Sequence, residues 1–322
     1  MLSRPDFLEK QIIVIHSYQL RGLRFANENL IVEEDGIVIE QATLHKIFAV
    51  FLIGEATIST KLIMKLKDFW ILLILLRKNL ELIDVIGDDL SGNSLLRQKQ
   101  YFLFESGDAA DSLARIIVTN KILNQESVLR KLREKDEIQK HTADKLHTLA
   151  GNAKLCQRSE KLLGIEGNAA KYFFHEYYLE MEWMGRYPRT KIDRNNLLLD
   201  IGYTFLFHFI EALLALYGFD LYKWFYHQEF YQRKSLVCDI EEPFRCIIDE
   251  SIRKAFNLGR ILPKDFGFAN GAYFLKPEAV QKYSGIFARA ILDHRESMYQ
   301  YVYDLYRYVL GMSRHEPFYS FS

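Results

Sequence analysis

The sequence predicts an α+β protein, with a small, mainly β N-terminal domain followed by a larger, all-α C-terminal domain. Three observations lead to this prediction. Short β-branched and apolar runs dominate the chain up to residue 87, apolar residues at helical spacing dominate it from residue 96, and the polar, turn-forming sequence DDLSGN at 88–93 separates them. We therefore expect a β-rich domain at 1–87, a linker at 88–95 and a helical domain at 96–322.

The N-terminal part reads as short strands interrupted by one helix. Asp35 and Gly36 stand between two β-branched runs, and this pair predicts a β-hairpin because glycine adopts positive φ without steric cost. The segment 59–68 has apolar residues at helical spacing. Strands are expected at 12–15, 30–32, 37–39, 47–53 and 70–76, and a short helix at 59–68.

The remainder is predicted to be helical. The segment 126–149 contains SVLRKLREKDEIQK, whose i,i+4 charge pairs are typical of a solvated helix. In 235–256 the apolar residues form one helical stripe, and 196–217 is apolar enough to be a buried helix. Helices are expected at 101–123, 126–149, 165–183, 196–217, 235–256 and within 276–310.

The charge balance excludes a uniformly basic protein but not a segregated basic face. The 42 Lys+Arg residues match the 42 Asp+Glu residues, so the net charge is +0. Residues 1–93 hold 10 basic and 13 acidic side chains, net −3, and residues 94–322 hold 32 and 29, net +3. A mildly basic helical half remains compatible with nucleic acid.

The cysteines and the apolar runs indicate the cellular compartment in which the protein is expected. Cys156, Cys238 and Cys246 form no C-x-x-C pair, which favours buried thiols in a reducing cytoplasm. The N-terminus shows no apolar signal-like run. The apolar stretch 197–216 is interrupted by charged and polar residues, so it is expected to be a core helix of a cytoplasmic protein with no membrane partner.

Two carboxylates in 235–256 are candidates for a site. Asp239 and Glu242 are spaced i,i+3 and share a helix face beside the apolar stripe. Pro243 cannot donate to the carbonyl of Asp239, so it predicts a kink there. Carboxylates near a core are costly unless paired or metal-bound. The residues alone leave a functional site and salt-bridged surface acids as alternatives.

A third carboxylate, Glu166, lies between Gly164 and Gly167 at the start of an apolar helix. It is either an acid favoured by the helix dipole or a carboxylate held close to a ligand. Together with His227 and Glu242 it makes a set of one imidazole and two carboxylates. Such a set suits Mn²⁺ or Mg²⁺, and these ions commonly act on phosphates.

A basic loop and a buried pair complete the candidates. Four cations lie between residues 186 and 194, where they could grip a phosphate backbone or merely solvate a connection. They are Arg186, Arg189, Lys191 and Arg194. His208 and Glu211, i,i+3 on the apolar helix, are expected to be a hydrogen-bonded core pair. No Gly-rich phosphate loop is present, so nucleotide hydrolysis by that route is unsupported.

Three sequence blocks resemble the CRISPR-associated integrase family, which supplies the catalytic subunit of the spacer-acquisition complex. They are LLGIEGNAAKYFF, RNNLLLDIGYTFLFHFIEALLALYGFD and YHQEFYQRKSLVCDIEEPFRCIID. They occur in order, with 61 residues from Glu166 to His227 and 15 more to Glu242, and the resemblance covers nearly the whole chain. One departure is the turn at 77–81, which lacks the glycine that family members often have there.

The resemblance implies a β domain that mediates homodimerisation and an α domain that holds Mg²⁺ or Mn²⁺. Glu166, His227 and Glu242 match the family's metal ligands, and Asp239 matches a neighbouring acid that either ligates or orients. The implied reaction is transesterification, in which the 3′-hydroxyl of a short DNA fragment attacks a phosphodiester of a CRISPR array.

The implied partners are DNA, a second copy and a small ferredoxin-like subunit. Lys234 and Arg245 would join the four loop cations in holding phosphates. The alternatives are a metal-dependent nuclease or resolvase of branched DNA, and a non-catalytic DNA-binding scaffold.

A pH dependence follows from the implied ligand set. His227 must be neutral to bind a metal, so DNA joining is expected to decrease as the pH drops below about 6.5, the usual pKa of histidine. Joining rates measured between pH 8 and pH 5 at saturating Mn²⁺ test this. A flat profile through pH 6 would show that no histidine with an ordinary pKa binds the metal.

Overall fold

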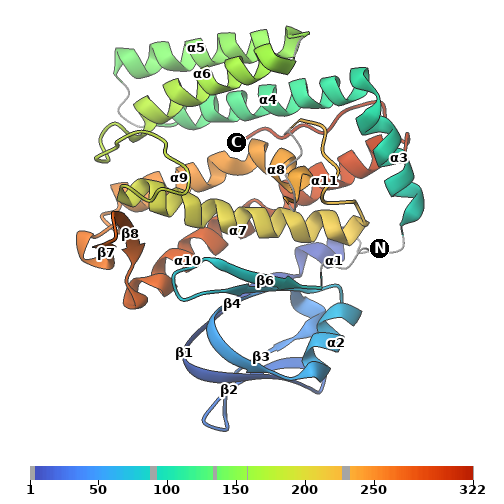
Figure 1. The fold of residues 1–322 in the computed structure, drawn as a ribbon, viewed down its shortest axis with the longest axis vertical. Helices are drawn as coiled ribbons and strands as arrows, with labels where there is room; N and C mark the ends of the chain where they lie inside the picture. The colour runs from blue at the N-terminus through green and yellow to red at the C-terminus, as the bar shows by residue number, and fades with distance from the viewer. Residues whose placement is uncertain (1–3, 88–92, 133–135, 158, 227–232, 322) are drawn as a thin grey trace.

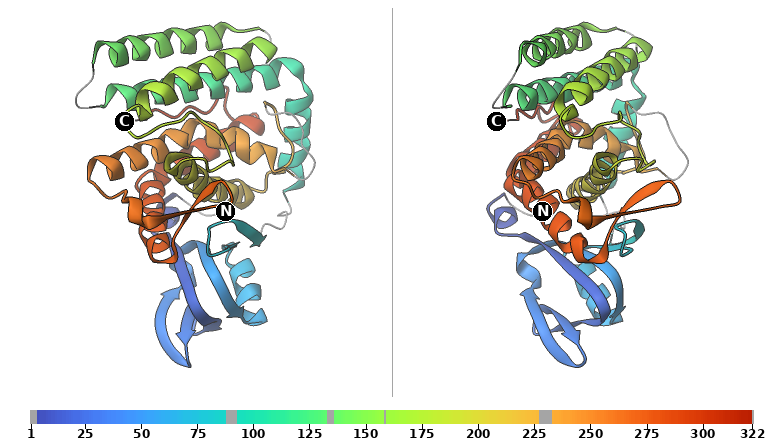
Figure 2. Two further views of the ribbon diagram at one scale, coloured as in Figure 1. Left: turned by 60° about the vertical axis from the view of Figure 1, so that its left-hand side comes forward. Right: turned by 90° about the vertical axis from the view of Figure 1, so that its left-hand side faces the viewer.

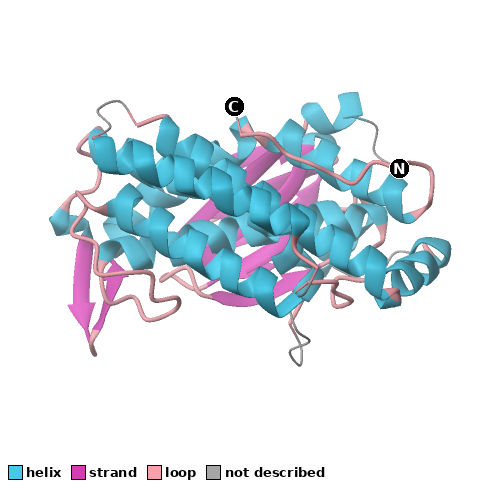
Figure 3. Ribbon diagram, turned by 90° about the horizontal axis from the view of Figure 1, so that it is seen from above, coloured by secondary structure: helices cyan, strands magenta, loops and turns pink. Residues whose placement is uncertain are grey.

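The computed structural model describes residues 4–87, 93–132, 136–157, 159–226 and 233–321, the side chains at 18–20, 159 and 160 excepted. A strand-rich domain lies at one end of the molecule, and the helices are stacked above it (Figure 1). Seen from above, the helices cover the strands (Figure 3). The predicted fold class is confirmed.

The N-terminal domain is a six-stranded mixed sheet with the order β3-β2-β1-β4-β5-β6. Its central strands β1, β4 and β5 are parallel neighbours, and the flanking pairs are antiparallel. Helix α2 (Thr60–Asp68) joins β4 to β5, and the Ser59 hydroxyl caps it by accepting from the Leu62 amide. The strands are β1 (Gln11–Ala26), β2 (Asn29–Glu34), β3 (Ile37–Thr43), β4 (Ile47–Ile58), β5 (Leu72–Leu76) and β6 (Leu82–Ile86).

Two turns show how positive φ is accommodated in this sheet. Asp35 and Gly36 have φ of 51° and 79°, so the predicted hairpin between β2 and β3 is confirmed. The turn at 77–81 forms the β5–β6 hairpin without a glycine, and Leu80 takes a φ of 66° instead. Leu80 is only 3% exposed, so burial of its side chain offsets the cost of the left-handed backbone.

The helices form two layers above the sheet. Helices α4, α5 and α6 make the outer layer, and α7, α9 and α11 lie between it and the sheet domain (Figure 1). Short α1 (Arg4–Leu8) packs against α11. The long helices are α3 (Ser94–Glu105), α4 (Gly107–Arg130), α5 (Glu137–Leu155), α6 (Ser159–Tyr178), α7 (Arg194–Tyr217), α9 (Arg245–Asn257), α10 (Pro277–Asp293) and α11 (Arg295–Val309).

Two predicted helices are divided in the structure, and the helix expected at 165–183 spans Ser159–Tyr178 instead. The segment 101–123 is divided because Ser106 is extended (ψ 110°), which ends α3 and begins α4. The segment 126–149 is also divided, because Asp136 starts α5 with a capping box in which its carboxylate accepts from the Gln139 amide at 2.7 Å. Helices α4 and α5 then pack against each other, so this segment is half buried and not a solvated helix.

The kink expected at Pro243 is confirmed, and one hairpin was missed. Helix α8 (Ser235–Glu241) gives way to the 3₁₀ turn η2 (Glu242–Phe244) before α9 begins. Strands β7 (Phe266–Ala269) and β8 (Ala272–Leu275) form an arm beside the helical body (Figure 2). Asn270 and Gly271, with φ of 53° and 77°, turn this hairpin, and the Asn-Gly pair was its signal in the sequence.

Helix α7 is the core of the helical region. It alone among the described helices has the length and apolar character of a membrane span, and 83% of its most apolar window is buried inside the protein. Nδ1 of His208 lies 2.7 Å from Oε2 of Glu211, so the predicted hydrogen-bonded core pair is confirmed. Of the expected linker at 88–95, residues 88–92 lie outside the described residues, and Asn93 caps α3.

The strained turn yields a stability prediction. We expect Leu80→Ala to lower the free energy of unfolding by about 3 kcal/mol, because it leaves a cavity and keeps the positive φ. Leu80→Gly should be about 1 kcal/mol less damaging, since glycine takes this φ without a Cβ clash. Urea denaturation of both variants measures the difference. If Leu80→Gly is the less stable of the two, the turn is not strained.

Candidate active site

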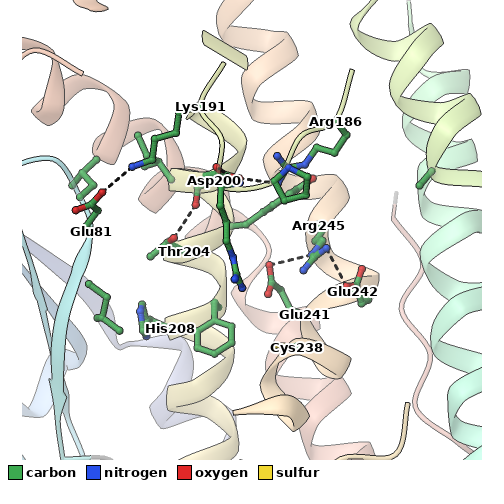
Figure 4. Close-up of a pocket in the computed structure, with 18 of the residues that line it drawn as sticks. Glu81, Arg186, Lys191, Asp200, Thr204, His208, Cys238, Glu241, Glu242 and Arg245 are labelled. Carbon is green, nitrogen blue, oxygen red and sulfur yellow. Dashed lines mark hydrogen bonds and ion pairs between the residues drawn. The ribbon is translucent and has the colours of Figure 1, made fainter. Parts of the chain in front are cut away.

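A pocket of about 800 Å³ lies where the β5–β6 turn meets helices α7 and α8 and the turn η2. Its wall contains more cations than acids. The cations are Lys121, Arg186, Arg189, Lys191, Arg233 and Arg245. The acids are Glu81, Asp200, Glu241 and Glu242. The side chains of this wall converge from both domains (Figure 4).

Two predicted carboxylates meet at one cation. The ammonium of Lys121 on α4 lies 2.5 Å from Oε1 of Glu166 on α6 and 2.7 Å from Oε2 of Glu242 on η2. The side chains of Lys121, Glu166 and Glu242 are 11%, 13% and 2% exposed. The Tyr226 hydroxyl donates to the other oxygen of Glu166, and Arg245 lies 3.0 Å from the other oxygen of Glu242. Each of the four carboxylate oxygens therefore contacts a donor.

The protonation states of this cluster follow from burial and charge. Burial alone would lower the pKa of Lys121, but Glu166 and Glu242 outweigh it, so that pKa is raised above its usual value. Burial, followed by the charge of Glu166, raises the pKa of Tyr226 far above that of a free phenol. Lys121 is therefore a cation and Tyr226 a neutral donor at physiological pH.

Local structure places Glu242 against Lys121. Glu242 lies where the regular α8 helix ends and the 3₁₀ turn η2, which contains Pro243, begins. Asn124, one turn after Lys121 on α4, donates to the Pro243 carbonyl at 2.9 Å and accepts from the Phe321 amide at 3.0 Å. The Asn124 side chain thus fastens η2 to α4 and also holds Phe321 beside them, which keeps Lys121 and Glu242 close together.

Asp239 faces the segment that leads to His227. Its Oδ2 accepts from the backbone amides of Phe225 and Tyr226, both at 3.2 Å. This contact gives Asp239 an orienting position in the described structure. His227 itself lies outside the described residues.

The donors present fit a hard divalent cation. Within the described ranges, no group of three or more His, Cys, Asp and Glu residues is close enough to hold a metal. Glu166 and Glu242 nevertheless direct one oxygen each at the same positive charge. Carboxylate oxygens converging on one position are the donors that Mg²⁺ and Mn²⁺ prefer.

The predicted phosphate-binding residues are mostly engaged in internal ion pairs. Arg186 lies 2.8 Å from Asp200, and Arg245 lies between Glu241 and Glu242 (Figure 4). The remaining pairs are Lys191 with Glu81, Arg194 with Glu182, and Lys234 with Glu211. Arg189 is exposed, and its guanidinium has no ion-pair partner among the described residues. Arg194 and Lys234 are not part of the pocket wall.

The sequence reasoning missed Lys121, Tyr226 and Arg233. A signal for Lys121 existed, because it continues the buried stripe of Leu113 and Ile117 at i,i+4 spacing. A lysine at a core position of an amphipathic helix requires a buried anion. Arg233 had no such signal; its Nε lies 3.1 Å from the Cys238 sulfur.

A buried tyrosine layer supports the arginines of the pocket. The ring of Tyr203 lies 5.0 Å from the Arg245 guanidinium and 5.7 Å from that of Arg186. Its hydroxyl donates to Oδ1 of Asp249 at 3.0 Å, as does the hydroxyl of Tyr178. Burial raises the pKa of Asp249 to about 6.

Comparison with known proteins agrees with this fold. The family described as "CRISPR associated protein Cas1" matches residues 14–289. The chain belongs to the Cas1 family. The resemblance found in the sequence is thereby confirmed, and the chain is placed among endonucleases and integrases of CRISPR systems.

One curated relative and two solved structures each match most of this Cas1 chain. A CRISPR-associated endonuclease Cas1 of Chlorobaculum tepidum is 30% identical over 269 residues, 78% of each chain. A chain of a Cas6-RT-Cas1–Cas2 complex matches with a TM-score of 0.81 and 23% identity over 98% of this chain, which spans 36% of that longer one. A casposase bound to an integration product matches with a TM-score of 0.80 and 17% identity, covering 96% of this chain and 94% of the casposase chain.

The buried Asp249 yields a pH prediction for this Cas1 protein. Its folded pKa of about 6 exceeds the ordinary 3.8, so the folded state binds the proton more tightly, and stability from this group is gained as the pH falls from about 6 to 4. The ionised form costs about 3 kcal/mol at pH 8. Asp249→Asn keeps an acceptor for both tyrosines without the charge.

We therefore expect the stability of Asp249→Asn, relative to wild type, to be higher at pH 8 than at pH 4.5. Urea denaturation at the two pH values measures this, and Asp293→Asn, at an exposed position on α10, is the control. A difference between variant and wild type that does not change with pH would contradict the raised pKa.

Proposed function

We propose that this Cas1 protein is a metal-dependent DNA integrase that inserts short DNA fragments into a CRISPR array. The observation that carries the proposal is the convergence of Glu166 and Glu242 on one cationic position beside a pocket rich in Arg and Lys. Buried carboxylates of this kind are costly unless they bind a cation. The family membership and the endonuclease relatives support the same reaction class.

Glu166 and Glu242, together with His227, would hold Mg²⁺ or Mn²⁺. When bound, the ion stabilises negative charge on the reacting phosphate and favours ionisation of the attacking hydroxyl. Asp239 orients the segment that leads to His227 through its two backbone hydrogen bonds. This contact of Asp239 matters because the site binds its metal more weakly when one of the ligands is displaced.

The reaction conserves phosphodiester bonds. The 3′-oxygen of the fragment forms a new bond to phosphorus, the old phosphorus–oxygen bond of the target breaks, and the leaving oxygen takes up a proton. One diester replaces another, so no nucleotide hydrolysis is needed, in keeping with the absence of a phosphate-binding loop motif from the sequence. The chain must chiefly position the hydroxyl and the phosphate.

The pocket cations supply that positioning. Arg189 is available to a phosphate, and Arg186 is held toward the pocket by Asp200 and Tyr203. Arg245 is anchored by Glu241 and Glu242, so it presents its remaining donors in a fixed direction. Lys191, Arg194 and Lys234 are held in ion pairs that a phosphate would have to displace.

The partners proposed are DNA, a second copy and a small ferredoxin-like subunit. The edge strand β3 exposes Ile37, Val38 and Ile39 by 68%, 48% and 45%, and an apolar sheet edge of this kind suits pairing between copies. The structural match to a chain of a complex that includes Cas2 supports a protein partner. The net charge of +3 on residues 94–322 predicts only weak non-specific DNA binding by the isolated chain.

The proposal predicts that Glu166→Ala and Glu242→Ala abolish joining. We expect the rate of DNA joining to decrease more than about a hundredfold, because each substitution removes a metal ligand. The assay joins a labelled 3′-hydroxyl fragment to a repeat duplex in Mn²⁺, with size-exclusion chromatography to verify the dimer. Glu137→Ala, at an acid whose side chain is 88% exposed, is the control. Joining at the wild-type rate by either variant would refute the ligand assignment.

The same assay separates the alternative functions. A fragment ending in a 3′-phosphate should not be joined, whereas a hydrolytic nuclease or resolvase would cleave branched DNA regardless of that end. A non-catalytic scaffold would bind DNA equally well in chelator and give no product in Mn²⁺.

A further inference from the structure

The position of Lys121 sets a condition on metal loading. Its ammonium contacts the two carboxylate oxygens that converge, at 2.5 Å from Glu166 and 2.7 Å from Glu242. The other oxygens of the pair are occupied by the Tyr226 hydroxyl and by Arg245. A divalent ion sharing the converging oxygens would come close to the ammonium, and two cations at such a distance repel each other.

We propose that Lys121 is a resident counter-ion that competes with the divalent metal for Glu166 and Glu242. The metal and the ammonium of Lys121 cannot both lie in direct contact with the converging oxygens of Glu166 and Glu242. The metal must therefore displace Lys121, and its apparent affinity is reduced by the free energy of that displacement. This inference rests on the proposed function, because it concerns the same metal.

Displaced Lys121 needs another anion. It is nearly buried, so leaving its charge without a partner is costly. Lys121 also lines the pocket together with Arg186 and Arg245, where a DNA phosphate would lie. A DNA phosphate can thus form an ion pair with Lys121 when the metal binds the two carboxylates. The two loading steps then favour each other, and by linkage the coupling is equal in both directions.

The structure therefore assigns Lys121 a positioning role that couples metal binding to DNA binding. Without DNA the ammonium of Lys121 holds the two carboxylates close together. With DNA it is drawn to the phosphate and the carboxylates become available. The integrase would then hold its metal firmly only when a substrate is in place.

The test compares Mn²⁺ binding by wild-type protein and Lys121→Met in the absence of DNA. Methionine has a similar length and no charge, so the variant leaves the carboxylate pair without its cation. We expect its dissociation constant, measured by the electron paramagnetic resonance signal of free Mn²⁺, to be at least tenfold lower than that of wild type. Lys140→Met, at an exposed lysine of α5, is the matched control and should bind as wild type does.

A second measurement guards against misfolding. Thermal unfolding without and with Mn²⁺ should show a larger metal-induced rise in melting temperature for Lys121→Met than for wild type, because binding to the folded state alone stabilises it. If Lys121→Met does not fold, Lys121→Gln, which keeps a hydrogen-bond donor, takes its place. Lys121→Arg, which keeps the charge, should retain the weaker affinity of wild type.

DNA completes the test of coupling. Adding a fragment with a 3′-phosphate, which cannot be joined, should strengthen Mn²⁺ binding by wild type at least fivefold more than binding by Lys121→Met. Unchanged or weaker Mn²⁺ binding by Lys121→Met, while wild type binds the metal, would overturn the role of Lys121 and leave the proposed function standing. No Mn²⁺ binding by wild type, with or without DNA, together with none by Lys121→Met would overturn both.

Discussion

Two carboxylates buried at one point are the constraint on which the rest of the structure depends. Glu166 and Glu242 come from different helical layers, and neither could be buried without a cation. Lys121 and Arg245 supply that charge, and Tyr226 occupies the remaining oxygen. The result is a nearly neutral cluster that ties α4, α6 and η2 together.

Secondary features of the fold serve to keep this cluster in place. Pro243 breaks the helix beside Glu242, and Asn124 holds the break against α4 while the chain near Phe321 packs over it. On the far side of Arg245, the ring of Tyr203 supports the guanidinium, and Asp249 anchors the tyrosine. Arg245 is thus held by aromatic packing as well as by its ion pairs with Glu241 and Glu242.

The sheet domain contributes one wall of the pocket. Its β5–β6 turn places Leu80 and Glu81 opposite the basic loop, where Glu81 pairs with Lys191 across the two domains. The zero net charge of the whole chain is compatible with DNA binding at such a pocket. The positive charge is local, gathered around one pocket, and most of it is neutralised by acids that a phosphate can replace.

The sequence by itself determined the features that depend on neighbours in the chain. Local backbone rules determine the Asp35-Gly36 hairpin, the capped helix after Ser59 and the kink at Pro243. The same rules predict the Asn270-Gly271 hairpin, which was missed. The sequence also singled out Glu166 and Glu242, because acids beside apolar stripes are conspicuous.

Only the tertiary structure decided what those acids contact. Lys121 lies 45 residues before Glu166 in the chain, and Tyr226 lies 60 residues after it. No local rule joins positions so far apart. The packing of α4 against α6 and η2 brings them together. Once they are buried, neither charge can be left without its partner, because an unpaired buried charge is strongly destabilising.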